Sequence, residues 1–305
     1  MSDRPVSLGR PTTGDLFALA VAVTAFSTAA PIIAASTVPA LAISFYRCLL
    51  GSSFTAPWAW FRHRAEWKGL TRSNVRGASI AGALLALHFA TWITSLRLTS
   101  VASSAALLAL QPIWAAFFAR WSGVQIGRQV WVGIGLSLVG VLLLTGVDVS
   151  TDPTSLLGDL LALIGGVLSA AYMTSGERVR QSVANPVYTT IAYGSAAAVL
   201  LIMCGIFRTP MSGFGVNGWL AILAVTLGGQ LLGHSLVNRA LKRTSATVGS
   251  LAILLEMPGA VIIAAVWLGQ VPPASIIPAL LLLLVGLVLV IRGSDAPTLT
   301  ELPPV

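Results

Sequence analysis

The chain has 305 residues, of which 56% are hydrophobic and only 9% are charged, and its mean hydropathy is +0.87. Soluble domains carry about 25% charged residues, so this composition excludes an ordinary soluble protein and indicates a chain that lies in a membrane. The formal net charge of +8 does not gather in a basic domain, so nucleic-acid binding is excluded as well.

Ten apolar runs follow one another along the chain, each close to the roughly 20 residues that a helix needs to cross a bilayer. We predict one membrane-spanning helix for each run: 16–35, 38–60, 76–96, 99–119, 129–147, 156–176, 187–207, 218–238, 246–268 and 273–291. The first run leads directly into further spans, so we expect no cleaved signal peptide. Cys48 and Cys204 fall inside spans and are interpreted as small buried side chains. No disulfide, metal site or cofactor is predicted.

The sequence contains an internal repeat. When 82–143 is shifted forward by 146 residues, it aligns with 228–289 without a gap and gives 16 identities in 62 positions. The less common matched residues are His88 with His234, Arg97 with Arg243, Pro112 with Pro258, Trp121 with Trp267, Gly123 with Gly269, and Gly140 with Gly286. Each copy holds five spans, an odd number, so the second copy enters the membrane from the opposite side. We therefore predict an all-α membrane protein with ten transmembrane helices in two inverted repeats around a central cavity. The repeats are expected at 14–147 and 156–293, with tails at 1–13 and 294–305.

The distribution of basic residues predicts the orientation. With the N-terminus inside, 15 of the 18 lysines and arginines fall in cytoplasmic segments: Arg4, Arg10, Arg62, Arg64, Lys68, Arg72, Arg76, Arg120, Arg128, Arg178, Arg180, Arg239, Lys242, Arg243 and Arg292. Outer loops hold only Arg97 and Arg208, and Arg47 lies within a span. This bias follows the positive-inside rule. We therefore predict an integral protein of a bacterial-type cytoplasmic (inner) membrane with both tails cytoplasmic.

Motifs for several chemistries are missing. The sequence has no Gly-rich phosphate-binding loop with its Lys, so we expect a gradient to drive any transport and expect no ATPase subunit. It has neither H-E-x-x-H nor G-x-S-x-G, and Glu256 with two histidines is too little for a metal site. No enzymatic activity is predicted. A membrane channel stays open as a different class, although inverted halves favour alternating access.

Two segments resemble the signature segments of the EamA-type transporters of the drug/metabolite transporter superfamily. They read HFATWITSLRLTSVASSAALLALQPIWAAFFA (88–119) and GHSLVNRALKRTSATVGSLAILLEMPGAVIIAAVWLGQVPP (233–273). The segment SAAYMTSGERVR (169–180) is similar to the family's sixth span and its basic end. One departure is the Glu256-Met257-Pro258 order, where the family usually reads Glu-Pro.

The resemblance implies ten helices, with the first four of each half around the cavity and the fifth and tenth packed outside. It also implies the export of small metabolites, amino-acid exporters of the YddG kind being the best-understood relatives. Within transport, the alternatives are lipid or glycolipid flipping and the export of cationic drugs.

Polar groups inside spans are functional candidates because burying them in a membrane is costly. His88 and Trp92 stand one helical turn apart, and Gln230, His234 and Asn238 follow at the same spacing in the eighth span. The shift of 146 residues superposes His88 on His234 and Trp92 on Asn238. Both halves are thus expected to direct a matched face towards the cavity. The other interpretation of these residues is hydrogen bonding between helices.

Trp114 and Tyr172 fall in the middle of helices, away from the interfaces where such residues usually collect, and suit the wall of a cavity. The predicted substrate cavity comprises His88, Trp92, Gln111, Trp114, Tyr172, Gln230, His234 and Asn238. Three prolines inside spans, Pro31, Pro112 and Pro258, are expected to kink their helices.

Glu256 and Arg47 are the candidates for charge coupling. Glu256 is the only acidic residue well inside a span. It either binds a cation or an amine beside the helix break at Pro258, or reaches interfacial water or Arg47. Arg47 either balances a substrate carboxylate or bonds backbone carbonyls of another helix.

Overall fold

The computed structural model describes residues 13–121, 123, 125–151, 154–180, 182–233, 236 and 254–294. Over these residues the chain is helical and contains no strand, which confirms the all-α prediction. The first half contains α1 (Thr13–Ala35), α2 (Ala40–Arg62), α3 (Arg64–Gly69), α4 (Arg72–Ser95), α5 (Val101–Leu108), α6 (Gln111–Trp121) and α7 (Arg128–Thr151). The second half contains α8 (Ser155–Arg180), α9 (Asn185–Ile206), α10 (Gly215–Ala224), the π-helix η1 (Val225–Gly233), α13 (Glu256–Leu268) and α14 (Ile276–Ser294).

Seven helical segments in the described part are long and apolar enough to cross a membrane. They are Leu16–Ala35, Arg72–Ser95, Val101–Trp121, Ser155–Glu177, Asn185–Ile206, Gly215–Gly233 and Ile276–Gly293. The predicted span 38–60 forms α2, a helix of 23 residues made less apolar by Arg47 and several hydroxyl side chains. The first part of the predicted span 246–268 lies outside the described residues. Its second part forms α13. The total of ten spans therefore stays a prediction.

Short polar residues cap the starts of two helices. The side chain of Thr71 accepts a hydrogen bond from the amide of Asn74 at the start of α4. Ser100 accepts one from the amide of Ser103 at the start of α5. Each bond satisfies an amide that has no partner within its own helix, so the α4–α5 hairpin begins its two helices at defined residues.

Two predicted spans differ from uniform α-helices. The span 99–119 is divided into α5 and α6 at Ala109–Leu110, because Pro112 has no N–H with which to continue the hydrogen-bond ladder. The span 218–238 begins as α10 and continues as the π-helix η1. The wider turn of a π-helix changes the spacing of side chains, so the face expected for Gln230, His234 and Asn238 does not follow from α-helical periodicity. His234 and Asn238 lie outside the described residues.

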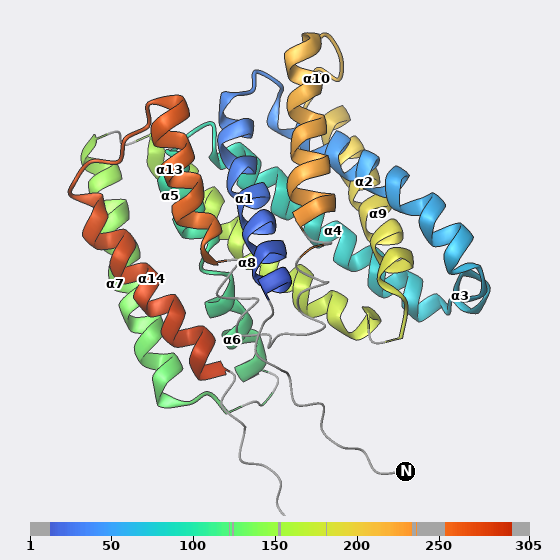
Figure 1. Ribbon diagram of the computed structural model, residues 1–305, viewed down its shortest axis with the longest axis horizontal. Helices are drawn as coiled ribbons and strands as arrows, with labels where there is room; N and C mark the ends of the chain where they lie inside the picture. The colour runs from blue at the N-terminus through green and yellow to red at the C-terminus, as the bar shows by residue number, and fades with distance from the viewer. Residues whose placement is uncertain are drawn as a thin grey trace, which may run out of the picture.

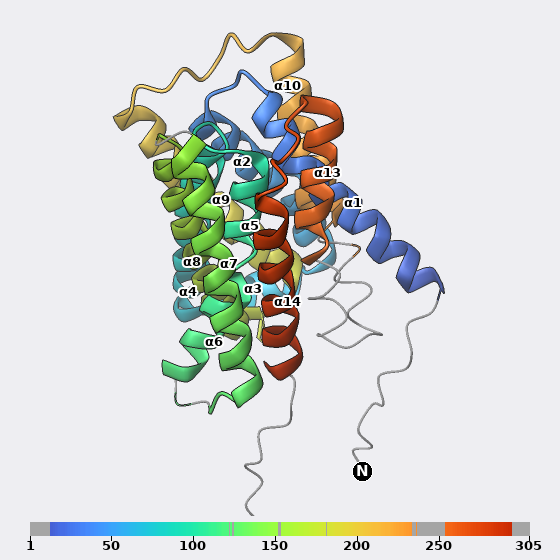
Figure 2. The ribbon, with the colours of Figure 1, turned by 90° about the vertical axis from the view of Figure 1, so that its left-hand side faces the viewer.

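The helices pack in pairs that combine one member from each half. α7 runs along α14 at one edge of the molecule, and α2 runs along α9 at the opposite edge (Figure 1). Figure 2 looks onto the α7–α14 pair, with α5 and α8 behind it. In the interior, α1 packs against α13 and η1, while α8 packs against α5, α6 and α4. The contacts correspond when the two halves exchange places: α1 with α13 corresponds to α8 with α5 and α6, and α1 with η1 corresponds to α8 with α4.

Small residues bring α7 and α14 into close contact. The backbone of Gly133 lies against the carbonyl of Gly286, and the backbone of Gly140 lies against the carbonyl of Ala279, leaving no room for a Cβ at either glycine. Gly140 and Gly286 are equivalent under the shift of 146 residues, as are Gly133 and Ala279. The contact is therefore reciprocal, which is the property of an interface with two-fold symmetry.

Candidate functional site

A partly open cavity of about 390 Å³ is walled by residues of α1, α4, α5, α6, α8, α13 and α14. Most of its side chains are alanine, leucine or methionine. Among the described residues that line it, Glu256 is the only ionisable one and Gln111 the only amide, and the ring of Trp92 supplies an aromatic surface. A mostly apolar wall with a few polar groups is typical of a small-molecule site.

Two breaks in helical structure border this cavity, one between α5 and α6 and one immediately before α13. The first interruption is at Ala109, where φ is −62° and ψ is −9°, and the second is at Leu255, where φ is −69° and ψ is −9°. These residues are 146 apart, so the repeat makes them equivalent and the backbone adopts nearly the same conformation in both halves. Discontinuous helices at matching positions of two repeats are a feature of binding sites in secondary transporters.

A proline follows each interruption by three residues. Pro112 cannot donate a hydrogen bond to the carbonyl of Leu108, and Pro258 cannot donate one to the carbonyl of Leu254. Leu108 and Leu254 are themselves equivalent and both line the cavity. The site thus combines one carboxyl group, which suits a cation or an amine, with two helix breaks at which a proline cannot donate to the carbonyl four residues before it.

The structure brings three of the predicted site residues to the cavity: Trp92, Gln111 and Glu256. His88 lies behind Trp92, with the two rings stacked at 5.8 Å and an interplanar angle of 3°. Its Nδ1 donates to the carbonyl of Gly165 on α8 at 2.9 Å. In this arrangement His88 joins α4 to α8 and supports the ring that lines the cavity.

Trp114 and Tyr172 pack into the helix bundle outside the cavity lining. Trp114 lies next to Phe117, with ring centroids 6.0 Å apart, and Tyr172 packs against the two hydrophobic clusters of the interior. The cavity is lined by Met173 instead of Tyr172, because one residue along a helix rotates a side chain by about 100°. Substrate contact by Trp114 and Tyr172 stays a prediction.

Arg47 and Gln230 form a buried pair between α2 and η1. Nε of Arg47 donates to Oε1 of Gln230 at 2.9 Å, and Nε2 of Gln230 donates to the carbonyl of Arg47 at 3.1 Å. Arg47 forms no ion pair within the described part of the chain. Neither residue lines the cavity described above.

Polar contacts that the sequence did not predict join the ends of α4, α5 and α1 in the predicted outer loops. Arg97 donates to the carbonyls of Ala34 at 3.4 Å, Val38 at 2.8 Å and Ser36, and its partial burial lowers the pKa of the guanidinium. The amide of Val101 donates to Oε1 of Gln270 at 3.1 Å. These bonds close this end of the bundle over the α4–α5 hairpin. The match of Arg97 with Arg243 in the repeat was the sequence feature that singled out Arg97.

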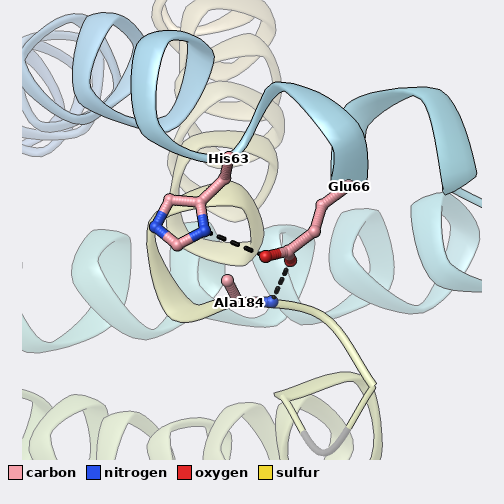
Figure 3. Close-up of polar contacts among 3 residues, drawn as sticks. All are labelled: His63, Glu66 and Ala184. Atoms are coloured by element: carbon pink, nitrogen blue, oxygen red, sulfur yellow. Dashed lines mark hydrogen bonds and ion pairs between the residues drawn. The ribbon is translucent and has the colours of Figure 1, made fainter.

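At the predicted cytoplasmic end, Glu66 of α3 connects the two halves. Figure 3 shows its carboxylate between Nδ1 of His63, at 2.9 Å, and the amide of Ala184, which donates at 2.7 Å. Ala184 immediately precedes α9, so the carboxylate meets the positive end of that helix. The hydrogen bond from Ala184, followed by that from His63, lowers the pKa of Glu66.

Comparison with known proteins follows the same division into halves. Residues 12–146 and 156–292 each match the model of the EamA-like transporter family. The chain belongs to the EamA-like transporter family. It is therefore an integral membrane protein of the drug/metabolite transporter superfamily, whose members handle small molecules.

Solved structures share the fold of this EamA-like chain. One of them, described as "Crystal structure of protein", superposes with a TM-score of 0.62 at 19% identity, covering 90% of this chain and 96% of the other. At this identity the likeness shows the fold alone. No curated protein matches the chain.

Proposed function

We propose that this EamA-like protein is a secondary transporter that exports small metabolites, with amino acids as the predicted class, by alternating access. The observation that carries the proposal is the cavity between two helices interrupted at equivalent residues, Ala109 and Leu255. Transporters place substrates at such half-helix ends, where backbone groups become available for binding. The amino group of a substrate would find an acceptor there in Glu256.

The proposal includes ten spans in two inverted repeats. Two observations support the inversion: the reciprocal contact of Gly133 with Gly286 and of Gly140 with Ala279, and helix packing that is preserved when the halves exchange places. We place the protein in a bacterial-type inner membrane with cytoplasmic tails, on the strength of the positive-inside bias. Impermeant cysteine reagents should label cysteines introduced into 148–155 only from outside and cysteines introduced into 62–74 only from inside. Labelling of both segments from one face would contradict the inversion.

The export of cationic drugs is the second candidate, and one observation favours it. Glu256 is the only ionisable side chain on the described lining, and a lone carboxylate in an apolar wall suits an organic cation. Lipid or glycolipid flipping would instead require a long slot open to lipid between helices. A channel would conduct without saturating.

Transport by purified protein in liposomes tests the proposal. Vesicles loaded with unlabelled compound should take up the labelled compound against its gradient, because an alternating-access carrier exchanges one molecule for another. The panel should contain amino acids, purines, sugars and cationic drugs. Saturable counterflow of amino acids is the expected result. Flux without saturation or counterflow would indicate a channel, and counterflow of cations alone would favour drug export.

A further inference from the structure

Arg47 carries a buried guanidinium that has a fixed orientation. The residue is 5% exposed and lies in α2, about a third of the way along the helix. The two hydrogen bonds that it exchanges with Gln230 of η1 fix the Nε edge of the guanidinium. One face of the group lies over the ring of Phe89 of α4, 4.0 Å from the ring centroid. Contacts from two other helices therefore hold the charged group in place.

The hydrogen-bonding capacity of this guanidinium is only partly used. Nη1 is buried and has no hydrogen-bond partner among the described residues. Arginine offers five N–H donors in a planar fork, and the end of the fork away from Nε matches a carboxylate through two parallel N–H···O bonds. A preoriented guanidinium with this end free is the arrangement that recognises a carboxylate group.

A charged side chain within a membrane span is costly unless it is paired or in contact with water. Glu256 interacts electrostatically with Arg47, but the two residues form no ion pair. The described residues thus orient Arg47 without neutralising it. An anionic group brought by the substrate would complete the coordination.

A chain of ring contacts joins Arg47 to the cavity. The guanidinium lies over Phe89, whose ring centroid is 4.9 Å from that of His88, and His88 is stacked on Trp92 at 5.8 Å. Trp92 lines the cavity that also contains Glu256. The His88–Trp92 stack therefore separates the positive group on one side from the negative group on the other.

We propose that Arg47 binds the carboxylate of the transported molecule, so that the substrate is a zwitterion bearing both an amino and a carboxyl group. This inference rests on the proposed function, in which Glu256 receives the amino group. The His88–Trp92 stack separates the two charges in the present conformation, and both engage the substrate when that stack moves during the transport cycle. A simple cation would leave Arg47 without its anionic partner.

Probes that differ only in the carboxyl group test the inference. For alanine, leucine and phenylalanine, competition in counterflow is measured with the amino acid, its carboxamide and its decarboxylated amine. The wild-type protein should prefer the amino acid over the other two by at least about tenfold, the size expected for hydrogen bonds to a charged group. Equal competition by all three members of each set would overturn the inference.

Two substitutions address the guanidinium itself. Gln230→Glu keeps the shape of the side chain and gives Arg47 an internal carboxylate, so it should abolish the preference for the amino acid while retaining the contact between α2 and η1. Arg47→Gln should also remove the preference, by deleting the positive charge. The exposed Arg64 of α3 provides the control, since Arg64→Gln should leave the ratio of amino-acid to carboxamide competition unchanged. If Arg47 has only a structural role, Arg47→Gln would lower competition by all probes equally and leave the ratio of amino-acid to carboxamide competition unchanged.

Ligand-induced thermal stabilisation of the purified protein separates this inference from the proposed function. If the amino acid stabilises the protein, its carboxamide does not, and Gln230→Glu removes the effect, the role of Arg47 is supported even where no probe is transported. In that case the absence of transport overturns the proposed amino-acid transport alone. Transport without discrimination overturns the role of Arg47 alone. Absence of both transport and stabilisation for every probe overturns both.

Discussion

Leu108 and Leu254 line the same cavity from opposite halves of the chain, and each lies four residues before a proline that cannot donate to its carbonyl. The two residues are 146 apart, so one interruption of the helix has been kept in both copies of the repeat. A proline within a helix costs about 3 kcal/mol. Because a proline stands at both equivalent positions beside the cavity, we expect the interruption to serve transport.

Replacing these prolines should separate stability from transport. Pro112→Ala and Pro258→Ala supply the missing N–H groups and favour continuous helices, so we expect a higher melting temperature together with transport reduced by about tenfold or more. Pro186→Ala, at the first turn of α9, is the control, because a proline there interrupts no helical hydrogen bond. Unchanged transport in both cavity variants would show that the breaks are not required.

Arg97→Ala should open the predicted outer end of the bundle. The substitution removes the hydrogen bonds that tie the α4–α5 connection to the carbonyls of Ala34, Ser36 and Val38. A cysteine introduced at Ala105, on the cavity wall, should then react several-fold faster with an impermeant reagent added outside. The native Cys48 and Cys204 are replaced by alanine for this measurement.

Arg208 provides the matched control for Arg97. It is also an arginine of a predicted outer loop, and it is exposed. Arg208→Ala should leave the reaction rate at position 105 unchanged. An equal increase in both variants would mean that loss of charge, and not loss of the connection between helices, caused the change.

The contribution of Glu66 to stability should depend on pH. Its pKa is lowered in the folded protein by the bonds from Ala184 and His63, so the carboxylate stabilises the fold above the unfolded pKa of about 4.3, and this contribution is lost as the pH falls through the folded pKa. The difference in melting temperature between wild type and Glu66→Gln should therefore shrink below about pH 4. We expect a difference of at most a few degrees, because the side chain is 39% exposed and solvent screens the interaction. A difference that grows on acidification would contradict this interpretation.

Sequence reasoning predicted the helices better than the side chains that line the site. Long apolar runs place α1, α4, α8, α9 and α14 within a few residues of the predicted spans, because the bilayer demands continuous hydrophobicity. The repeat marked Pro112 and Pro258, but a proline in an apolar run is compatible with either a kink or a complete break. The side-chain assignments depend on helix rotation, so Met173 takes the place predicted for Tyr172. The π-helix that contains Gln230 could not be predicted, because an apolar sequence does not distinguish a π-helix from an α-helix.

The close contact between α7 and α14 should tolerate no larger side chain. Gly133→Leu would force a side chain against the backbone of Gly286, and overpacking of this kind typically costs about 1–3 kcal/mol. Gly135 lies on the same helix with no neighbour within 4 Å, so Gly135→Leu is the control. We expect a lower unfolding free energy for Gly133→Leu alone. Equal effects would locate the cost in the helix itself and not in its contact with α14.

Glu256 is the candidate residue for coupling transport to an energy source. We expect facilitated export, in which an amino acid moves down its own gradient, because the described residues of the lining include a single carboxylate and no second acidic group for a proton relay. Counterflow should therefore persist when protonophores collapse an imposed pH gradient. Glu256→Gln removes the charge that would bind the amino group and should weaken apparent substrate affinity by about tenfold, while Glu177→Gln, at an exposed position of α8, should have no effect.

The decisive comparison is concentrative uptake with and without a pH gradient, in wild type, Glu256→Gln and His88→Gln. A facilitated exporter equilibrates its substrate under both conditions, and His88→Gln changes only the rate, because this side chain supports Trp92 and lies outside the cavity lining. Accumulation that requires the pH gradient and disappears in Glu256→Gln would overturn the facilitated mechanism. Glu256 would then be the proton carrier, since a lone carboxylate within a membrane can accept and release a proton as the site alternates between the two sides.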